Sequence, residues 1–160
     1  MWLKAGTALV VATSGLAALW LGEHPTGFFD GRSLVIAVGL ALLAAAPFRP
    51  GQRSSGLVAA ICVLAAFAGG WVYGGRSHSA AFNECVDHGE RVRDYLADYK
   101  RHSGDFPESL AQLGRGLPCQ LMLPPQLLRY ERTDTGYTLT FRDWFVSHIA
   151  TESQPFTATK

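Results

Sequence analysis

The sequence predicts a membrane-anchored α+β protein, with three transmembrane helices followed by a small domain in which a helix packs on an antiparallel sheet. Residues 2–21, 33–48 and 56–73 are apolar stretches in which Lys4 is the only charged side chain. A bilayer core needs about 20 apolar helical residues to cross it, and backbone groups in lipid must be satisfied within the segment. Most charged residues lie in the second half of the chain, where polar and apolar residues alternate as in strands.

These differences in composition divide the chain into three regions. We expect a transmembrane region at 1–75, an exposed domain at 76–150 and a flexible polar tail at 151–160. The second stretch has only 13 apolar residues before Pro47, so it either spans fully with help from its flanking phenylalanines or is re-entrant. The first stretch is also compatible with a signal peptide, but its apolar core is long and no basic cluster precedes it, which favours a retained helix.

Loop charges predict the orientation of the chain. Lys4 and the amino terminus precede the first helix, and the second connection contains Arg49 and Arg53 without an acidic residue. Positive loops tend to stay in the cytoplasm. Three crossings then place the chain after Arg76 outside, so we expect a bacterial inner-membrane protein with a cytoplasmic N-terminus and a periplasmic C-terminal domain.

The cysteines support the same side of the membrane. Cys62 lies within the third apolar stretch, where it is expected to pack as a small apolar group, while Cys85 and Cys119 lie in the exposed domain. In an oxidising compartment such a pair usually forms a disulfide. The alternative is two unrelated buried thiols.

The exposed domain begins with an amphipathic helix over residues 80–102. Its apolar residues recur at spacings of three and four, with Gly89 filling one position: Phe82, Cys85, Val92, Leu96 and Tyr99. A short helix is expected after Pro107, with Leu110 and Leu113 on its buried edge. Residues 127–132 and 137–142 then alternate around an Asp/Gly turn and predict a β-hairpin, to which 144–150 can add a third strand.

Residues 99–113 contain a motif of the form Y-x-x-x-x-G-x-[FY]-P-x-S-L-x-x-L. It consists of Tyr99, Gly104, Phe106, Pro107, Ser109, Leu110 and Leu113. This stretch resembles the soluble part of type IV pilins and type II secretion pseudopilins. The resemblance implies one long helix over 56–102, embedded in the membrane first and amphipathic afterwards, that leads into an antiparallel sheet. Ala60 and Ile61 stand where a pilin has a glutamate, so it implies a pilin-like module on an anchor and not a filament subunit.

The third apolar stretch contains small residues four positions apart. They are Ala65, Ala66, Gly69, Gly70 and Gly74. Such spacing lets helices approach closely. Packing against the first two helices and packing against a partner's transmembrane helix both explain the pattern.

The sequence offers little for catalysis, cofactors, metals or nucleic acid. Its net charge is +1 and it has no run of basic residues. Phosphate-binding loops, nucleophile elbows and zinc-protease motifs are absent from it. Cys85 and His88 share a helix face, but no other metal ligand follows at a recognisable spacing.

We therefore expect a non-enzymatic assembly or accessory protein of the bacterial envelope. Its partners would be other envelope membrane proteins, including pilus or secretion components, and the lipid bilayer. The alternative is a membrane sensor or regulatory protein whose exposed domain binds a small ligand in a concave apolar pocket.

Overall fold

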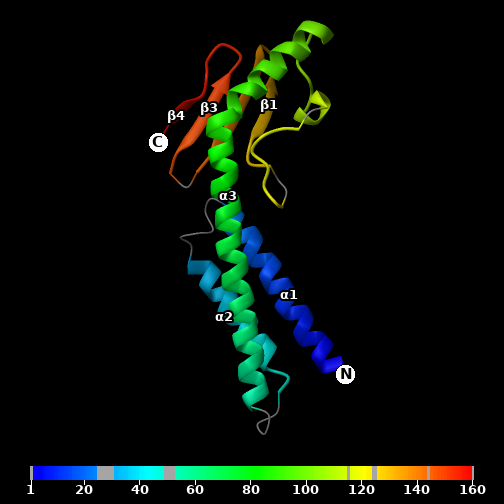
Figure 1. Cartoon of the computed structure of the whole chain (residues 1–160), viewed down its shortest axis with the longest axis vertical. Coiled ribbons are helices and arrows are strands. Elements are labelled where there is room, and N and C mark those ends of the chain that lie inside the picture. The colour runs from blue at the N-terminus through cyan, green and yellow to red at the C-terminus, as the bar shows by residue number, and fades with distance from the viewer. Residues whose placement is uncertain are drawn as a thin grey trace. The chain divides into compact units, whose positions relative to one another are not determined.

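The computed structural model describes residues 2–24, 31–48, 53–114, 116–123, 126–143 and 145–159. Its elements in chain order are α1 (Trp2–Glu23), α2 (Gly31–Ala45), α3 (Arg53–Ser103), η2 (Leu110–Leu113), β1 (Arg129–Thr133), β2 (Gly136–Arg142), β3 (Ser147–Thr151) and β4 (Thr157–Thr159) (Figure 1). The chain divides into two compact units, Met1–Ser77 and His78–Lys160, and α3 contributes residues to both.

In the N-terminal unit, α1 and α3 run in the same direction and touch through glycines. Gly15 lies against Ala66, and Gly22 lies against Gly75, so residue numbers rise together along the two helices. A Cβ atom added to Gly22 would lie 2.4 Å from the carbonyl oxygen of Trp71. The two backbones can approach this closely because glycine has no side chain at the crossing.

The α2 helix runs in the opposite direction to the other two. Its Ala37 shares a cluster with Phe67, whereas its Ala44 shares a cluster with Ala59, which lies earlier in α3. The core of this unit consists mainly of small side chains, because alanines of α2 face α3.

The expectation of three transmembrane helices is corrected by the length of α2. By length and composition, α1 and α3 can cross a membrane, whereas the apolar part of α2 covers only Ser33–Ala45. At 1.5 Å per residue, α2 is about 22 Å long, which is shorter than the hydrocarbon core of about 30 Å. The helix ends two residues before Pro47, since proline disfavours helical backbone in the residue before it.

The C-terminal unit is an antiparallel sheet packed on the second half of α3. Its strands follow the sequence order β1-β2-β3-β4, with Tyr130 opposite Leu139 and Leu139 opposite Ala150. Leu139 on β2 and Leu96 on α3 are both fully buried at the centre of this core. The predicted α+β architecture with an antiparallel sheet is confirmed, and so is the predicted apolar stripe of α3, with Cys85, Val92 and Leu96 all buried.

The expectation of a flexible tail at 151–160 differs from the structure. Thr151 belongs to β3, and Thr157–Thr159 forms β4, which pairs with β3. The ring of Phe156 lies 5.1 Å from that of Phe141, and a Cβ atom on Gly89 would lie 2.9 Å from it. This segment is ordered because Phe156 fills the space that Gly89 leaves open on α3.

Candidate functional site

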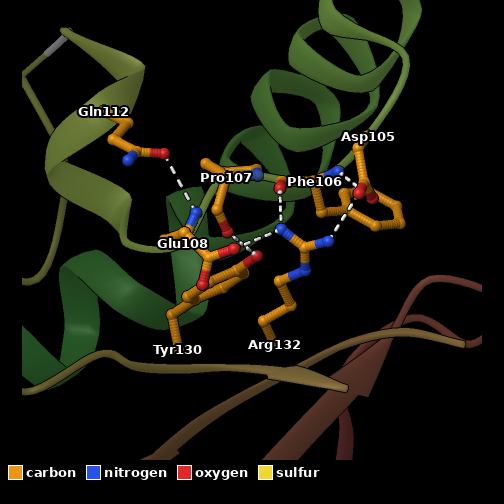
Figure 2. A network of polar contacts seen from close by, with 7 residues as sticks. All are labelled: Asp105, Phe106, Pro107, Glu108, Gln112, Tyr130 and Arg132. Carbon is orange, nitrogen blue, oxygen red and sulfur yellow. Dashed lines mark hydrogen bonds and ion pairs between the residues drawn. The ribbon is translucent and has the colours of Figure 1, made fainter. Parts of the chain in front are cut away.

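Polar contacts of the C-terminal unit converge on Arg132, near the end of β1 (Figure 2). Its Nη1 donates to the carbonyl oxygen of Phe106 at 2.9 Å and to Oε1 of Glu108 at 2.6 Å. Its Nη2 donates to Oδ2 of Asp105 at 2.5 Å. A planar guanidinium suits this site because its donors form a fixed fork, which a lysine cannot reproduce. One side chain of β1 therefore holds the segment that follows α3.

Tyr130, two residues earlier on β1, makes a contact similar to that of Arg132. Its hydroxyl donates to the carbonyl oxygen of Pro107 at 2.6 Å. The carbonyl oxygens of Phe106 and Pro107 accept hydrogen bonds from side chains of β1. Neither accepts a hydrogen bond from the backbone N–H four residues later, as it would in an α-helix. This explains why the helix expected directly after Pro107 is reduced to the 3₁₀ turn η2, which begins at Leu110.

The motif residues occupy different environments around Arg132. Three of them lie in the core, namely Phe106, Pro107 and Leu110. The other four lie outside the core. Gly104 ends α3 at a φ of 83°, and Leu113 packs on the edge of the core. Ser109 is exposed and Tyr99 is half-buried. The motif therefore supplies the backbone carbonyls and core anchors of the Arg132 site.

Electrostatics keep this site charged at neutral pH. The N–H of Phe106 donates to Asp105 at 2.8 Å and, with Arg132 and Lys100, holds the pKa of that carboxyl below its ordinary value. Partial burial raises the pKa of the Tyr130 hydroxyl, so it remains a donor. The ammonium group of Lys100 lies 4.5 Å above the centre of the Phe106 ring, a cation–π contact.

Two surface hollows flank β1. One has a volume of about 480 Å³ and is lined by Lys100, Asp105, Phe106, Glu108, Arg132, Thr133, Asp134, Thr135 and Gly136. The other, of about 400 Å³, is lined by Glu108, Ser109, Leu110, Ala111, Leu117, Gln126, Leu128 and Tyr130. Glu108 lines both hollows, so they adjoin along β1. The charged lining of the first suits polar groups of a partner better than an apolar small molecule.

The expected disulfide joins Cys85 of α3 to Cys119, and both residues are buried. Cys119 has a φ of 71°, and its N–H donates to Oε2 of Glu84 at 3.0 Å. In the chain-entropy model, a loop of this length contributes about 3–4 kcal/mol. Since Cys85 is oxidised, it cannot supply the thiolate that its spacing to His88 suggests. No group of three or more metal-ligating side chains occurs among the residues that the structure describes.

Small residues of α3 lie at the crossing with α1. A Cβ atom on Gly70 would lie 2.3 Å from the carbonyl oxygen of Gly15, and one on Gly74 would lie 2.2 Å from that of Leu19. The other members of the sequence pattern are half-buried Ala66, which faces Gly15, and exposed Ala65 and Gly69. Gly70 and Gly74 therefore act within the unit, while Ala65 and Gly69 face outward.

Sequence reasoning missed two polar groups. Glu23 lies beyond the first apolar stretch, 2–21, but α1 continues through it. The residue is 4% exposed, and its carboxylate accepts a hydrogen bond from the Ser77 hydroxyl at 2.5 Å. Gly22, which permits the close crossing of α1 and α3, was the feature of the sequence that could have indicated burial of the neighbouring Glu23. Arg132 was missed because its partners lie more than 20 residues away in the sequence.

The contacts around Arg132 are hydrogen bonds and ion pairs, an arrangement suited to fixing a loop and presenting a recognition surface. Comparison of the chain with protein families, curated proteins and solved structures gives no match.

Proposed function

We propose that the chain is a membrane-anchored, non-enzymatic assembly or accessory protein, whose N-terminal unit lies in the bilayer. The observation that carries this proposal is the inverted packing of that unit. Large apolar side chains point outward, among them Leu16, Leu34, Val35, Leu42 and Leu57. Small or polar residues lie inside, among them Ser14, Ala18, Ala41, Ala44 and Ala59.

A water-soluble bundle would bury the large residues and expose the small ones. Full burial of one leucine or valine is worth about 1.5–3 kcal/mol, so exposing five to water forfeits roughly 10 kcal/mol. That amount is comparable to the whole stability of a domain. Hydrocarbon around the unit removes this cost, because lipid tails are as apolar as the side chains that face them.

The C-terminal unit then belongs on the oxidising side of the membrane, in the bacterial case the periplasm. The buried Cys85–Cys119 disulfide supports this side, because cytosolic thiols are kept reduced. The positive residues of the second connection support it independently.

We infer that the exposed unit acts through protein contacts along β1. Support comes from its position at one end of the strand order, which leaves edge backbone groups for a partner strand. The Arg132 site fixes the neighbouring loop, so the surface is preorganised. A long helix leading into an antiparallel meander is also what the resemblance to pilins and pseudopilins implies, which makes envelope proteins of pilus or secretion machinery the first partners to test.

The alternative, a ligand-binding sensor, is favoured by one observation, the hollow of about 480 Å³ beside Arg132. Its lining would suit a small polar ligand. We rank this second because the guanidinium of Arg132 is already engaged by Asp105 and Glu108.

Two measurements test the proposed function. After an alkaline carbonate wash, the full chain should stay with the membrane pellet. Release into the supernatant would contradict the proposed membrane anchor. A photo-crosslinking residue at exposed Glu131 on β1 should then yield one defined adduct with another membrane protein. The matched control is exposed Arg91 on α3, and identical adducts at both positions would argue against a β1 docking surface.

A further inference from the structure

Strand β1 lies at the edge of the sheet, and its register shows which of its backbone groups face outward. Thr133 and Gly136 flank the two-residue turn between β1 and β2, so they form a hydrogen-bonded pair. Hydrogen-bonded and non-hydrogen-bonded pairs alternate along an antiparallel ladder, and Tyr130 and Arg132 therefore belong to non-hydrogen-bonded pairs. Their N–H and C=O groups point away from β2, to the side where no strand follows among the described residues.

A strand added to this edge would direct alternate side chains toward the two hollows beside β1. Tyr130 and Arg132 project from the face of the sheet that carries residues 105–108 (Figure 2). Residues opposite each other across an antiparallel pair project from the same face. A partner residue opposite Tyr130 would thus face the hollow of about 400 Å³, and one opposite Arg132 would face the hollow of about 480 Å³.

The hollow beside Tyr130 suits an apolar side chain. Part of its lining is polar, but four of its residues are apolar and belong to three different segments: Leu110, Ala111, Leu117 and Leu128. Apolar side chains that converge from several segments form a pocket for an apolar group.

The hollow beside Arg132 has an excess of negative charge. The guanidinium is shared between the carboxylates of Asp105 and Glu108, at 2.5 and 2.6 Å. The other basic residue of this hollow is Lys100, whose Nζ lies 2.8 Å from Oε1 of Glu152. Both cations are therefore already paired, and one of them is paired twice.

Asp134 adds a further carboxylate to the same hollow. It lies in the turn after β1, is exposed, and forms no ion pair with any residue that the structure describes. A basic side chain directed into this hollow would be attracted, and an acidic one would be repelled.

We propose that β1 binds an extended segment of another envelope protein as a fifth, antiparallel strand, in which a basic residue is followed two positions later by an apolar one. The basic residue lies opposite Arg132 and the apolar residue opposite Tyr130, because an antiparallel partner meets Arg132 first. Main-chain hydrogen bonds supply affinity, and the two hollows supply specificity. The proposal rests on the docking along β1 proposed above and names the chemistry of the partner.

The test uses the full chain in a neutral detergent, with its native disulfide intact. The probe is a fluorescent peptide of sequence Ser-Thr-Arg-Thr-Leu-Thr-Ser, and fluorescence anisotropy measures its Kd. One control peptide has glutamate in place of arginine. Two others each contain one N-methyl group, either on the leucine nitrogen, which faces β1, or on the nitrogen of the threonine before it, which faces away.

We expect the glutamate peptide to bind at least about tenfold more weakly, because its charge opposes that of the hollow. The N-methyl group on leucine should weaken binding about tenfold by removing a main-chain hydrogen bond, whereas the one on threonine should change Kd by less than about twofold. Asp134→Asn retains a residue suited to a turn, and it should weaken binding of the arginine peptide about two- to fivefold.

Equal effects of the two N-methyl groups would overturn strand addition, and equal affinities for the arginine and glutamate peptides would overturn the basic specificity. Failure of every peptide to bind, while Glu131 still gives a defined adduct with another membrane protein, would overturn this pattern and leave docking along β1 standing. Loss of that adduct as well would remove both proposals. A dimer that excludes the peptides, detected by light scattering, would assign the edge to a second copy of the chain and overturn the proposed partner.

Discussion

Arg132 shows how one side chain can connect parts of the sequence that no local pattern links. Its partners Phe106 and Glu108 lie in an irregular segment, which has few backbone hydrogen bonds of its own. The ion pair to Glu108 is largely exposed, so solvent screens it and it contributes little. The bond to the carbonyl of Phe106 matters more, because that residue is buried and its carbonyl depends on Arg132.

We expect Arg132→Met to lower the free energy of unfolding of the C-terminal unit by about 1–3 kcal/mol, the cost of leaving a partly buried carbonyl without its charged donor. Urea unfolding of the full chain in detergent micelles, followed by near-UV circular dichroism, measures this change. Arg129→Met is the matched control, since Arg129 is exposed on the same strand and should change stability by less than about 0.5 kcal/mol. Equal losses for the two variants would contradict a special role for Arg132.

At the scale of elements, the crossing of α1 and α3 depends on glycines that differ in their surroundings. Gly70 and Gly74 face the α1 backbone, whereas a Cβ atom on Gly69 would meet nothing within 4 Å. We expect Gly70→Ala and Gly74→Ala each to cost about 1–3 kcal/mol through overpacking. Gly69→Ala should be neutral or stabilising by up to about 1 kcal/mol, because alanine is the better helix former.

The midpoint of unfolding in sodium dodecyl sulfate, followed by tryptophan fluorescence, measures the effect of these glycine variants. Similar midpoints for the Gly69, Gly70 and Gly74 variants would indicate that α1 does not pack on this face of α3.

The contact between α3 and the segment leading into β4 predicts how the stability of the C-terminal unit depends on pH. Glu90 accepts the N–H of Phe156 at 2.8 Å and pairs with Arg93 at 2.6 Å. Partial burial alone would raise the pKa of Glu90, but these two donors outweigh burial and hold the pKa below its ordinary value of 4.5. A carboxyl whose folded pKa is depressed contributes stability above its unfolded pKa and loses it as pH falls through the folded pKa.

We therefore expect the unfolding free energy of the C-terminal unit to fall as pH drops below about 4.5, and Glu90→Gln to reduce the slope of that fall. Wild type and variant should differ at pH 7 and converge in acid, which urea titrations at several pH values would reveal. A constant difference across the whole range would mean that the charge of Glu90 is not involved.

The sequence predicted those elements whose signals are local. The stripe of Cys85, Val92 and Leu96 identified the amphipathic half of α3, and the Asp/Gly turn identified the β1–β2 hairpin. β4 could not be predicted in this way, since its order depends on Phe156 meeting Gly89 from a distant element. The prediction of a helix directly after Pro107 was wrong for the same reason, because side chains of β1 bond to the carbonyl oxygens of Phe106 and Pro107.

At the scale of the whole molecule, the direction of the helices decides how often the proposed membrane anchor crosses the bilayer. Within the N-terminal unit, α1 and α3 run in parallel. Two parallel spans require the chain to return across the bilayer between them. α2 lies between them in the chain, and its rise of about 22 Å is shorter than the hydrocarbon core of about 30 Å.

The N-terminus and the C-terminal unit should therefore lie on opposite faces of the membrane, even though α2 alone is too short to span. A fluorescent protein fused before residue 1 should fold and fluoresce in the cytoplasm, and alkaline phosphatase fused after residue 160 should be active outside. Phosphatase fused after residue 50 is the control, and it should be inactive because the proposed orientation places that connection in the cytoplasm. Cytoplasmic signals from both ends of the chain would mean an even number of crossings, which parallel α1 and α3 spans do not allow.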